Sequence, residues 1–90
     1  MFDSDYYNEL YRTIGMIIRK KRLIHYSNME QFARDIGMKV QQYSKYEMGK
    51  NMKVKTMHRI LNHLNVSFSE FYAEVEMHMK KYNAKSINNN

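Results

Sequence analysis

The sequence predicts an all-α domain built from five helices. Its 90 residues include no proline and only three glycines, which favours helices over a β architecture rich in turns. No stretch alternates apolar and polar side chains over six residues, as a half-buried strand would. Apolar residues recur instead at helical spacing in five segments, which capping residues and glycines separate. The length fits one domain.

The first expected helix is long and covers residues 5–25, with Ser4 or Asp5 as its cap. Gly15 lies inside this helix, where it costs about 1 kcal/mol relative to alanine. Close packing of a neighbouring helix would explain why a glycine stands there.

Two short helices follow. Ser27 and Asn28 are the candidate caps of the second helix, and Gly37 ends it. The third helix is expected over residues 40–47 and ends at Gly49. Two helices with this spacing between their terminating glycines are typical of a helix-turn-helix.

The last two helices also carry signals at their ends. The fourth is expected to start at its cap Thr56 and to end at the left-handed terminator Asn65. The fifth opens with the capping box Ser67-x-x-Glu70 and continues to about residue 82.

Positive charge is concentrated in the middle of the chain. Residues 19–59 carry eleven Lys or Arg and three Asp or Glu, whereas residues 1–18 are net negative and residues 60–90 are balanced. The whole chain has a net charge of +6. A concentrated basic region in a small domain indicates a polyanionic partner, nucleic acid above all. Solubility alone is the alternative explanation.

Several functions are excluded by what the sequence lacks. It has no cysteine, so a disulfide scaffold, a thiol nucleophile and a cysteine-ligated zinc site are ruled out. His58 and His63 are five residues apart and fall on different faces of a helix, away from a shared metal site. Without a nucleophile–base pair or a phosphate loop, we expect no enzyme, no cofactor and no metal. No apolar run is long enough to span a membrane, and we expect a cytoplasmic protein without a membrane partner.

A set of correlated positions matches a known pattern: Arg22, Phe32-Ala33, Ile36-Gly37, Tyr46-Glu47-x-Gly49-Lys50 and Leu64-Asn65-Val66. These residues resemble the Cro/C1-type helix-turn-helix family, also called xenobiotic-response-element-like, over residues 14–72. The resemblance implies a five-helix lambda-repressor-like domain with extended first and last helices. Residues 1–13 then extend the first helix, and residues 73–90 extend the last helix and end in a frayed tail.

The resemblance also implies a structural ion pair between Arg22 and Glu47, which would fix the register between the first and third helices. Two ordinary surface charges are the alternative. The sequence departs from the family at Met29, where a glutamine often contacts a phosphate, and at Ser27, where leucine is common. We expect Tyr26 to fill the space of that leucine.

In this family the third helix enters the major groove of DNA, and the loop that follows holds phosphates. The resemblance and the outward face of this helix together predict base contacts by Val40, Gln41, Gln42, Ser44 and Lys45. Phosphate contacts are predicted for Asn28, Lys39, Lys50, Asn51, Lys53 and Lys55.

The predicted function is that of a sequence-specific regulator of transcription, a small dimeric repressor that reads an inverted repeat in double-stranded DNA. It would act on a bacterial chromosome, a phage or a plasmid. The homodimer is expected to use Val75, Met79 and Tyr82 on the last helix. Two alternatives stay open: the terminal helices pack on each other within one chain, or they bind another protein, as in antitoxins and anti-repressors.

Overall fold

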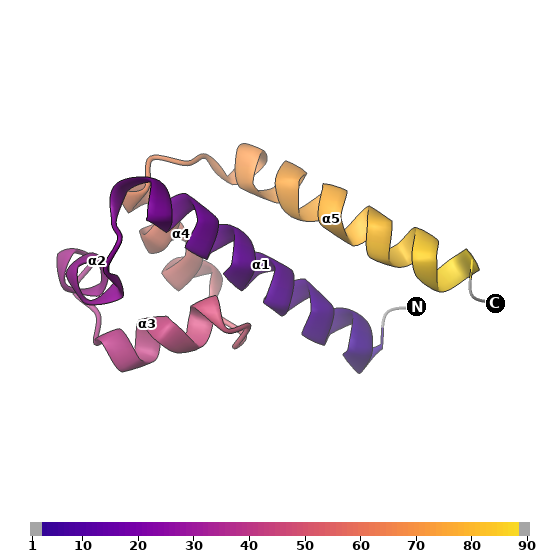
Figure 1. Ribbon diagram of the computed structural model, residues 1–90, viewed down its shortest axis with the longest axis horizontal. Coiled ribbons are helices and arrows are strands. Elements are labelled where there is room, and N and C mark those ends of the chain that lie inside the picture. The colour runs from indigo at the N-terminus through magenta and orange to yellow at the C-terminus, as the bar shows by residue number, and fades with distance from the viewer. Residues whose placement is uncertain (1–2, 89–90) are drawn as a thin grey trace.

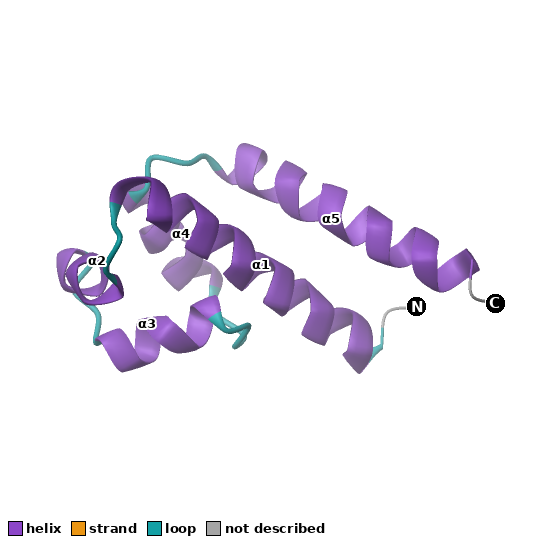
Figure 2. Cartoon of the chain, in the orientation of Figure 1, coloured by secondary structure: helices purple, strands orange, loops and turns teal. Residues whose placement is uncertain are grey.

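A computed structural model describes residues 3–88, and it describes side chains for residues 3–81. Within this range the chain forms five α-helices and no strand (Figure 2), which confirms the predicted all-α class. The helices are α1 (Ser4–His25), α2 (Met29–Asp35), α3 (Val40–Glu47), α4 (Val54–His63) and α5 (Phe68–Asn88).

The two long helices, α1 and α5, lie side by side and run in opposite directions, and the three shorter helices gather at one end of this pair (Figure 1). Ion pairs join the long helices. The Nζ atoms of Lys20 and Lys21 lie 3.1 and 2.8 Å from the carboxylate oxygens of Glu74. Two members of the basic run at the end of α1 are therefore used within the chain.

All five helices contribute side chains to one buried core. The largest of these side chains are fully enclosed: Ile17, Ile18, Phe32, Tyr43, Ile60, Leu61 and Phe71. Ala33 is 1% exposed, and its small side chain suits the close contact between α2 and α3. This core fixes the position of α3 relative to α1.

Two residues predicted to form a dimer surface lie in this core instead. Val75 and Met79 are each 3% exposed, and the hydroxyl of Thr13 donates to the sulfur of Met79 at 3.7 Å. Because α1 of the same chain covers this side of α5, neither side chain is available to a second copy. The side chain of Tyr82, the third predicted residue, lies outside the described part of the structure.

The first two helices both begin at a side-chain cap. Asp3 caps α1, because its carboxylate accepts the N–H of Tyr6 at 3.0 Å, so the expected cap Ser4 or Asp5 is wrong. Asn28 caps α2, as one of the two predicted candidates. Its Oδ1 accepts two backbone N–H groups of the first turn at 2.7 and 3.2 Å.

Helix α4 begins earlier than predicted. Lys53 is its N-cap, and Val54 is already helical, so Thr56 lies inside the first turn. The N–H of Met57 bonds to the carbonyl of Lys53 at 3.0 Å. No side chain caps this helix, which is why a search for capping residues misplaces its start.

Helix α5 starts as predicted and continues further. The N–H of Glu70 donates to the hydroxyl of Ser67 at 3.2 Å, which confirms the N-terminal cap. The helix runs to Asn88 rather than to residue 82, because no proline or glycine interrupts it. Residues 86–88, predicted as part of a frayed tail, belong to the helix, and residues 89–90 lie outside the described range.

Three helices end at a residue in the left-handed conformation, as predicted. The φ angles are 70° at Gly37, 100° at Gly49 and 58° at Asn65. In each case the next N–H reaches back to a carbonyl five residues earlier, which satisfies a free group at the helix end. These bonds are Met38 to Ala33, Lys50 to Lys45 and Val66 to Leu61, at 2.8, 2.9 and 3.0 Å.

Candidate nucleic-acid interface

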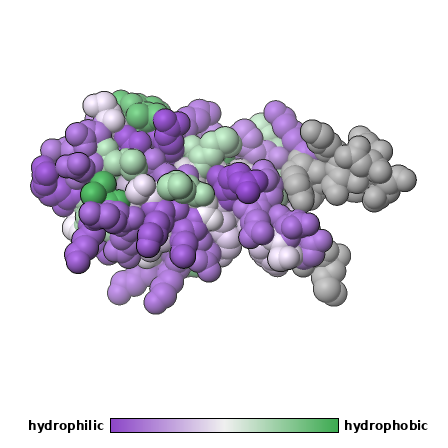
Figure 3. All heavy atoms as spheres, turned by 60° about the horizontal axis from the view of Figure 1, so that its bottom comes forward, coloured by the Kyte–Doolittle hydropathy of each residue, from purple (hydrophilic) through white to green (hydrophobic). Residues whose placement is uncertain are grey.

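Helix α3 turns one face to the core and the opposite face to solvent. Tyr43 is fully buried, whereas Gln41, Gln42 and Lys45 are exposed. The face of the molecule that carries α3 is largely hydrophilic, with separate hydrophobic spots (Figure 3). The exposed side chains offer amide and ammonium groups of the kind that can bond to base edges.

The other two predicted base-contact residues are less accessible. Val40 is half-buried and packs against the core, and Ser44 is half-buried with its Oγ 4.0 Å from the sulfur of Met48. Both sit on the flank of α3 rather than on its outermost line. The polar surface of α3 therefore consists mainly of Gln41, Gln42 and Lys45.

The predicted phosphate-contact residues all lie on the surface. Lys39 precedes α3. The loop between α3 and α4 carries Lys50, Asn51 and Lys53, and the first turn of α4 carries Lys55. None of these four lysines forms a salt bridge within residues 3–81. Asn28 is exposed at the start of α2. Its side-chain Oδ1 already accepts the capping bonds, so only the side-chain NH₂ group remains to donate to a phosphate.

The predicted pair of Arg22 and Glu47 is present, and it is buried. Arg22 Nε lies 2.6 Å from Glu47 Oε2, and Arg22 Nη2 donates to Glu47 Oε1 at 3.1 Å. Each side chain is 4% exposed, and Arg22 Nη1 also donates to the carbonyl of Tyr26 at 2.9 Å. The hydrogen bond to Glu47 raises the pKa of Arg22, so the guanidinium stays charged. Because Glu47 is the last residue of α3, the pair fixes this end of the helix to α1.

The hydroxyl of Tyr43 lies in the same buried region. Among the described residues it has no hydrogen-bonding partner. Burial, and next the proximity of Glu47, raise the pKa of Tyr43 far above its ordinary value. The phenol is therefore neutral in the folded protein.

Tyr26, the residue before Ser27, is half-buried and packs against the core. Its ring centre lies 5.0 Å from that of Phe32 in an edge-to-face arrangement, and its hydroxyl donates to Asp35 Oδ2 at 2.8 Å. The bond to Asp35 raises the pKa of Tyr26. That Tyr26 fills the space of the family's leucine stays a prediction.

Arg59 holds α4 against the turn between α2 and α3. Its Nη2 donates to the carbonyl of Ile36 and, at 3.1 Å, to that of Gly37. The sequence-based predictions give Arg59 no role, because an arginine that bonds to backbone carbonyls leaves no recognisable spacing. This contact fixes the turn that sets the angle of α3.

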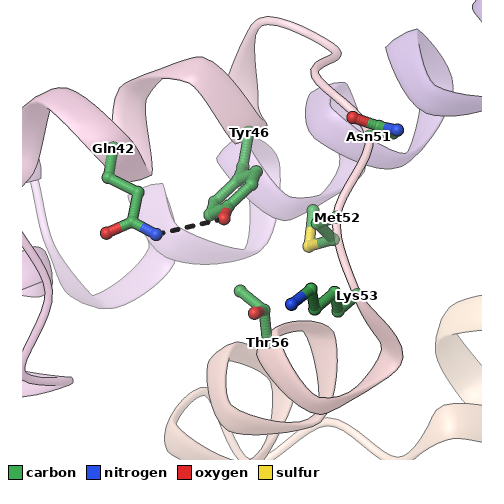
Figure 4. A pocket seen from close by; sticks show the side chains of 6 residues that line it. All are labelled: Gln42, Tyr46, Asn51, Met52, Lys53 and Thr56. Atoms are coloured by element: carbon green, nitrogen blue, oxygen red, sulfur yellow. Dashed lines mark hydrogen bonds between the residues drawn. The ribbon is translucent and has the colours of Figure 1, made fainter.

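A hollow of about 360 Å³ opens between α3 and the loop that leads to α4 (Figure 4). It brings a predicted base-contact residue, Gln42, together with two predicted phosphate residues, Asn51 and Lys53. Gln42 Nε2 donates to the hydroxyl of Tyr46 at 3.3 Å. Tyr46 enters the predictions only as part of the family pattern. Its spacing of four residues from Gln42 on a helix is the signal that points to this contact.

Two further properties bear on function. None of the helices within the described residues is long and apolar enough to cross a membrane. The described residues also contain no group of three or more His, Cys, Asp or Glu that could hold a metal ion.

Helix α2, the turn at Gly37 and helix α3, held to α1 by the pair of Arg22 and Glu47, together define a helix-turn-helix domain. A family model described as helix-turn-helix matches residues 13–71, about two thirds of the chain. The chain therefore belongs to the Cro/C1-type helix-turn-helix family, whose all-α fold is lambda-repressor-like. This membership makes it a DNA-binding regulator. No curated protein and no solved structure matches the chain significantly.

Proposed function

We propose that this protein is a repressor of transcription that binds a specific inverted repeat in double-stranded DNA as a homodimer. One observation carries the proposal. Helix α3 presents Gln41, Gln42 and Lys45 to solvent from a position fixed by the buried pair of Arg22 and Glu47. A rigid helix with exposed amides is suited to the major groove, where each base pair shows a distinct pattern of donors and acceptors.

The two groups of surface residues have different tasks in this proposal. Gln41, Gln42 and Lys45 read bases, with Val40 and Ser44 at the flank of the contact. The lysines around α3 neutralise phosphates and set affinity without regard to sequence. The absence of salt bridges at these lysines supports this role, because their charges are free to meet DNA.

The dimer follows from the size of the contact. One domain of this kind reads few base pairs, and two copies reading half-sites one helical turn apart give the required specificity. With Val75 and Met79 buried, a dimer contact on α5 would have to use its exposed side. Tyr72 and Met77 are 40% and 64% exposed there. We place the action of the protein in the cytoplasm, on the nucleoid or on phage or plasmid DNA.

Selection of bound duplexes from a random pool, at moderate salt, tests this function. The expected result is an enriched inverted repeat whose half-sites lie about 10 base pairs apart. Sedimentation of the complex then gives two chains per duplex. Weak binding with no enriched sequence would contradict the proposal.

A second function is favoured by a different observation. An apolar groove of about 510 Å³ lies between α1 and α5, and its lining includes Tyr6, Leu10, Tyr72 and Ala73. A protein partner that binds there would make this chain an antitoxin or anti-repressor module. Substitution of Leu10 by aspartate would then abolish partner binding and leave the DNA selection unchanged.

A further inference from the structure

We propose that Tyr46 is a positioning residue that holds the amide of Gln42 in one orientation, so that Gln42 selects adenine over guanine. The inference rests on the proposed DNA-binding function. It assigns a role in sequence specificity to a side chain that belongs to the inner side of α3.

The contact itself distinguishes Gln42 from its neighbour. Gln42 Nε2 donates to the hydroxyl of Tyr46 at 3.3 Å, whereas Gln41 makes no side-chain hydrogen bond within residues 3–81. A free glutamine presents its amide oxygen or its amide nitrogen with equal ease after rotation of the last bond. The bond to Tyr46, in which Nε2 is the donor, favours one orientation of the amide at one of the two exposed glutamines.

Tyr46 is suited to hold another side chain because it is itself held. Its ring is half-buried and packs against the core, and the next residue, Glu47, is fixed by Arg22. Its hydroxyl reaches the hollow, opposite Lys53 and Thr56 (Figure 4). The hydroxyl is therefore a fixed anchor for the more mobile side chain of Gln42.

The orientation determines which base fits. With Nε2 turned to Tyr46, the amide oxygen of Gln42 lies on the side away from the phenol (Figure 4). That oxygen can accept from N6 of adenine, while the second hydrogen on Nε2 donates to N7. Guanine shows two acceptors, O6 and N7, in the major groove. The amide oxygen would then face O6, and an amide that turns over gives up the bond from Nε2 to Tyr46 and sets its oxygen against N7.

The test compares Tyr46→Phe, Gln42→Ala and the double variant with the wild type. Each protein is titrated against the selected duplex and against duplexes that carry each other base pair at every half-site position. Gln42→Ala identifies the base pair that Gln42 reads. Tyr46→Phe keeps the ring and removes only the hydroxyl. Tyr11→Phe is the matched control, because it removes the hydroxyl of a half-buried tyrosine on α1, a residue outside the proposed DNA and dimer contacts.

At the base pair identified by Gln42→Ala, we expect Tyr46→Phe to lower the preference for adenine over guanine by about 2- to 10-fold. The melting temperature and the salt dependence of binding stay at wild-type values, which separates positioning from a structural role. The double variant matches Gln42→Ala, because the hydroxyl acts only through that side chain. Tyr11→Phe leaves the preference unchanged.

Two results would overturn the inference while leaving the proposed function intact. In one, Tyr46→Phe retains the full wild-type preference at that base pair. In the other, Gln42→Ala alters no base pair at all. If the wild type itself distinguishes no duplex, the proposed function fails, and the inference fails with it.

Discussion

Gly15 of α1 lies directly against the backbone at the end of α3. A Cβ at this position would be 2.6 Å from the carbonyl oxygen of Glu47 and closer still to that of Tyr46. The close approach that the glycine predicts is therefore confirmed. It brings the two helices near enough for Arg22, two turns further along α1, to reach Glu47.

Substitution of Gly15 by alanine is expected to destabilise the protein. Alanine favours the helix by about 1 kcal/mol, but the overlap involves backbone atoms that cannot turn aside. We expect a net loss of about 2 kcal/mol in the free energy of unfolding, measured by urea denaturation. Met16→Ala, at an exposed neighbouring position, should change little. A Gly15→Ala protein as stable as the wild type would show that α1 and α3 are not so tightly packed.

Breaking the buried ion pair of Arg22 and Glu47 is expected to lower the free energy of unfolding by more than Gly15→Ala does. Arg22→Met leaves the Glu47 carboxylate enclosed without its partner, and the expected loss is about 3–5 kcal/mol. The double variant Arg22→Met/Glu47→Leu should recover much of this loss, since no unpaired charge remains buried. Chemical denaturation of the three proteins measures the difference. A loss below about 1 kcal/mol in the single variant would instead indicate an ordinary surface pair.

Tyr43→Phe is expected to maintain or increase stability at neutral pH, by up to about 1 kcal/mol, because the hydroxyl is buried without a hydrogen-bonding partner among the described residues. The raised pKa of Tyr43 also predicts a loss of stability in alkali. Above about pH 10 the unfolded chain releases this proton and the folded chain does not, so the wild type loses stability as pH rises. Unfolding curves between pH 8 and 11 should show a weaker decline for Tyr43→Phe. Marked destabilisation at pH 7 would mean that the hydroxyl bonds to Glu47 after all.

The ion pairs between α1 and α5 predict that the stability of the protein falls at acidic pH. The hydrogen bond from Lys21 lowers the pKa of Glu74, and Lys20 adds to the effect. The stabilisation is present above the ordinary pKa of a glutamate, near pH 4, and is lost as pH falls through the lowered value. Glu74→Gln should remove this part of the acid dependence and cost less than about 1 kcal/mol at pH 7. If the wild type and Glu74→Gln lost stability equally as pH falls, the ion pairs of Glu74 would make no contribution to acid unfolding.

Lys53, in the loop before α4, and Lys55, in its first turn, are expected to strengthen binding to all DNA sequences alike. Lys53→Ala and Lys55→Ala should each weaken binding to every duplex and reduce the salt slope by about one. Lys80→Ala removes an exposed lysine from α5 and serves as the charge-matched control. Fluorescence anisotropy at several salt concentrations measures the slopes. Unchanged slopes in the loop variants would place the phosphate contacts elsewhere.

Features that depend on local chemistry could be predicted from the sequence. The left-handed ends at Gly37 and Asn65 follow from residue type, and α3 has its predicted bounds. The ion pair of Arg22 and Glu47 was accessible only through the family resemblance, because the two residues are 25 positions apart. Composition and spacing alone do not connect them.

Features that depend on packing could not be predicted. Val75 and Met79 form an apolar stripe, and a stripe does not tell whether α1 or a second chain covers it. The start of α4 at Val54 could not be predicted, because its N-cap Lys53 makes no side-chain capping bond. The bond between Gln42 and Tyr46 requires knowing that the phenol reaches the surface although its ring packs inward.

If α3 reads base pairs, Gln41→Ala changes binding to the selected duplex at particular positions only. The wild type, Gln41→Ala and Lys53→Ala are titrated against that duplex and against its single-base-pair variants. We expect Gln41→Ala to lose about 1–3 kcal/mol of discrimination at one base pair in each half-site and to keep the wild-type salt slope. A uniform loss across all duplexes, equal to that of Lys53→Ala, would contradict it.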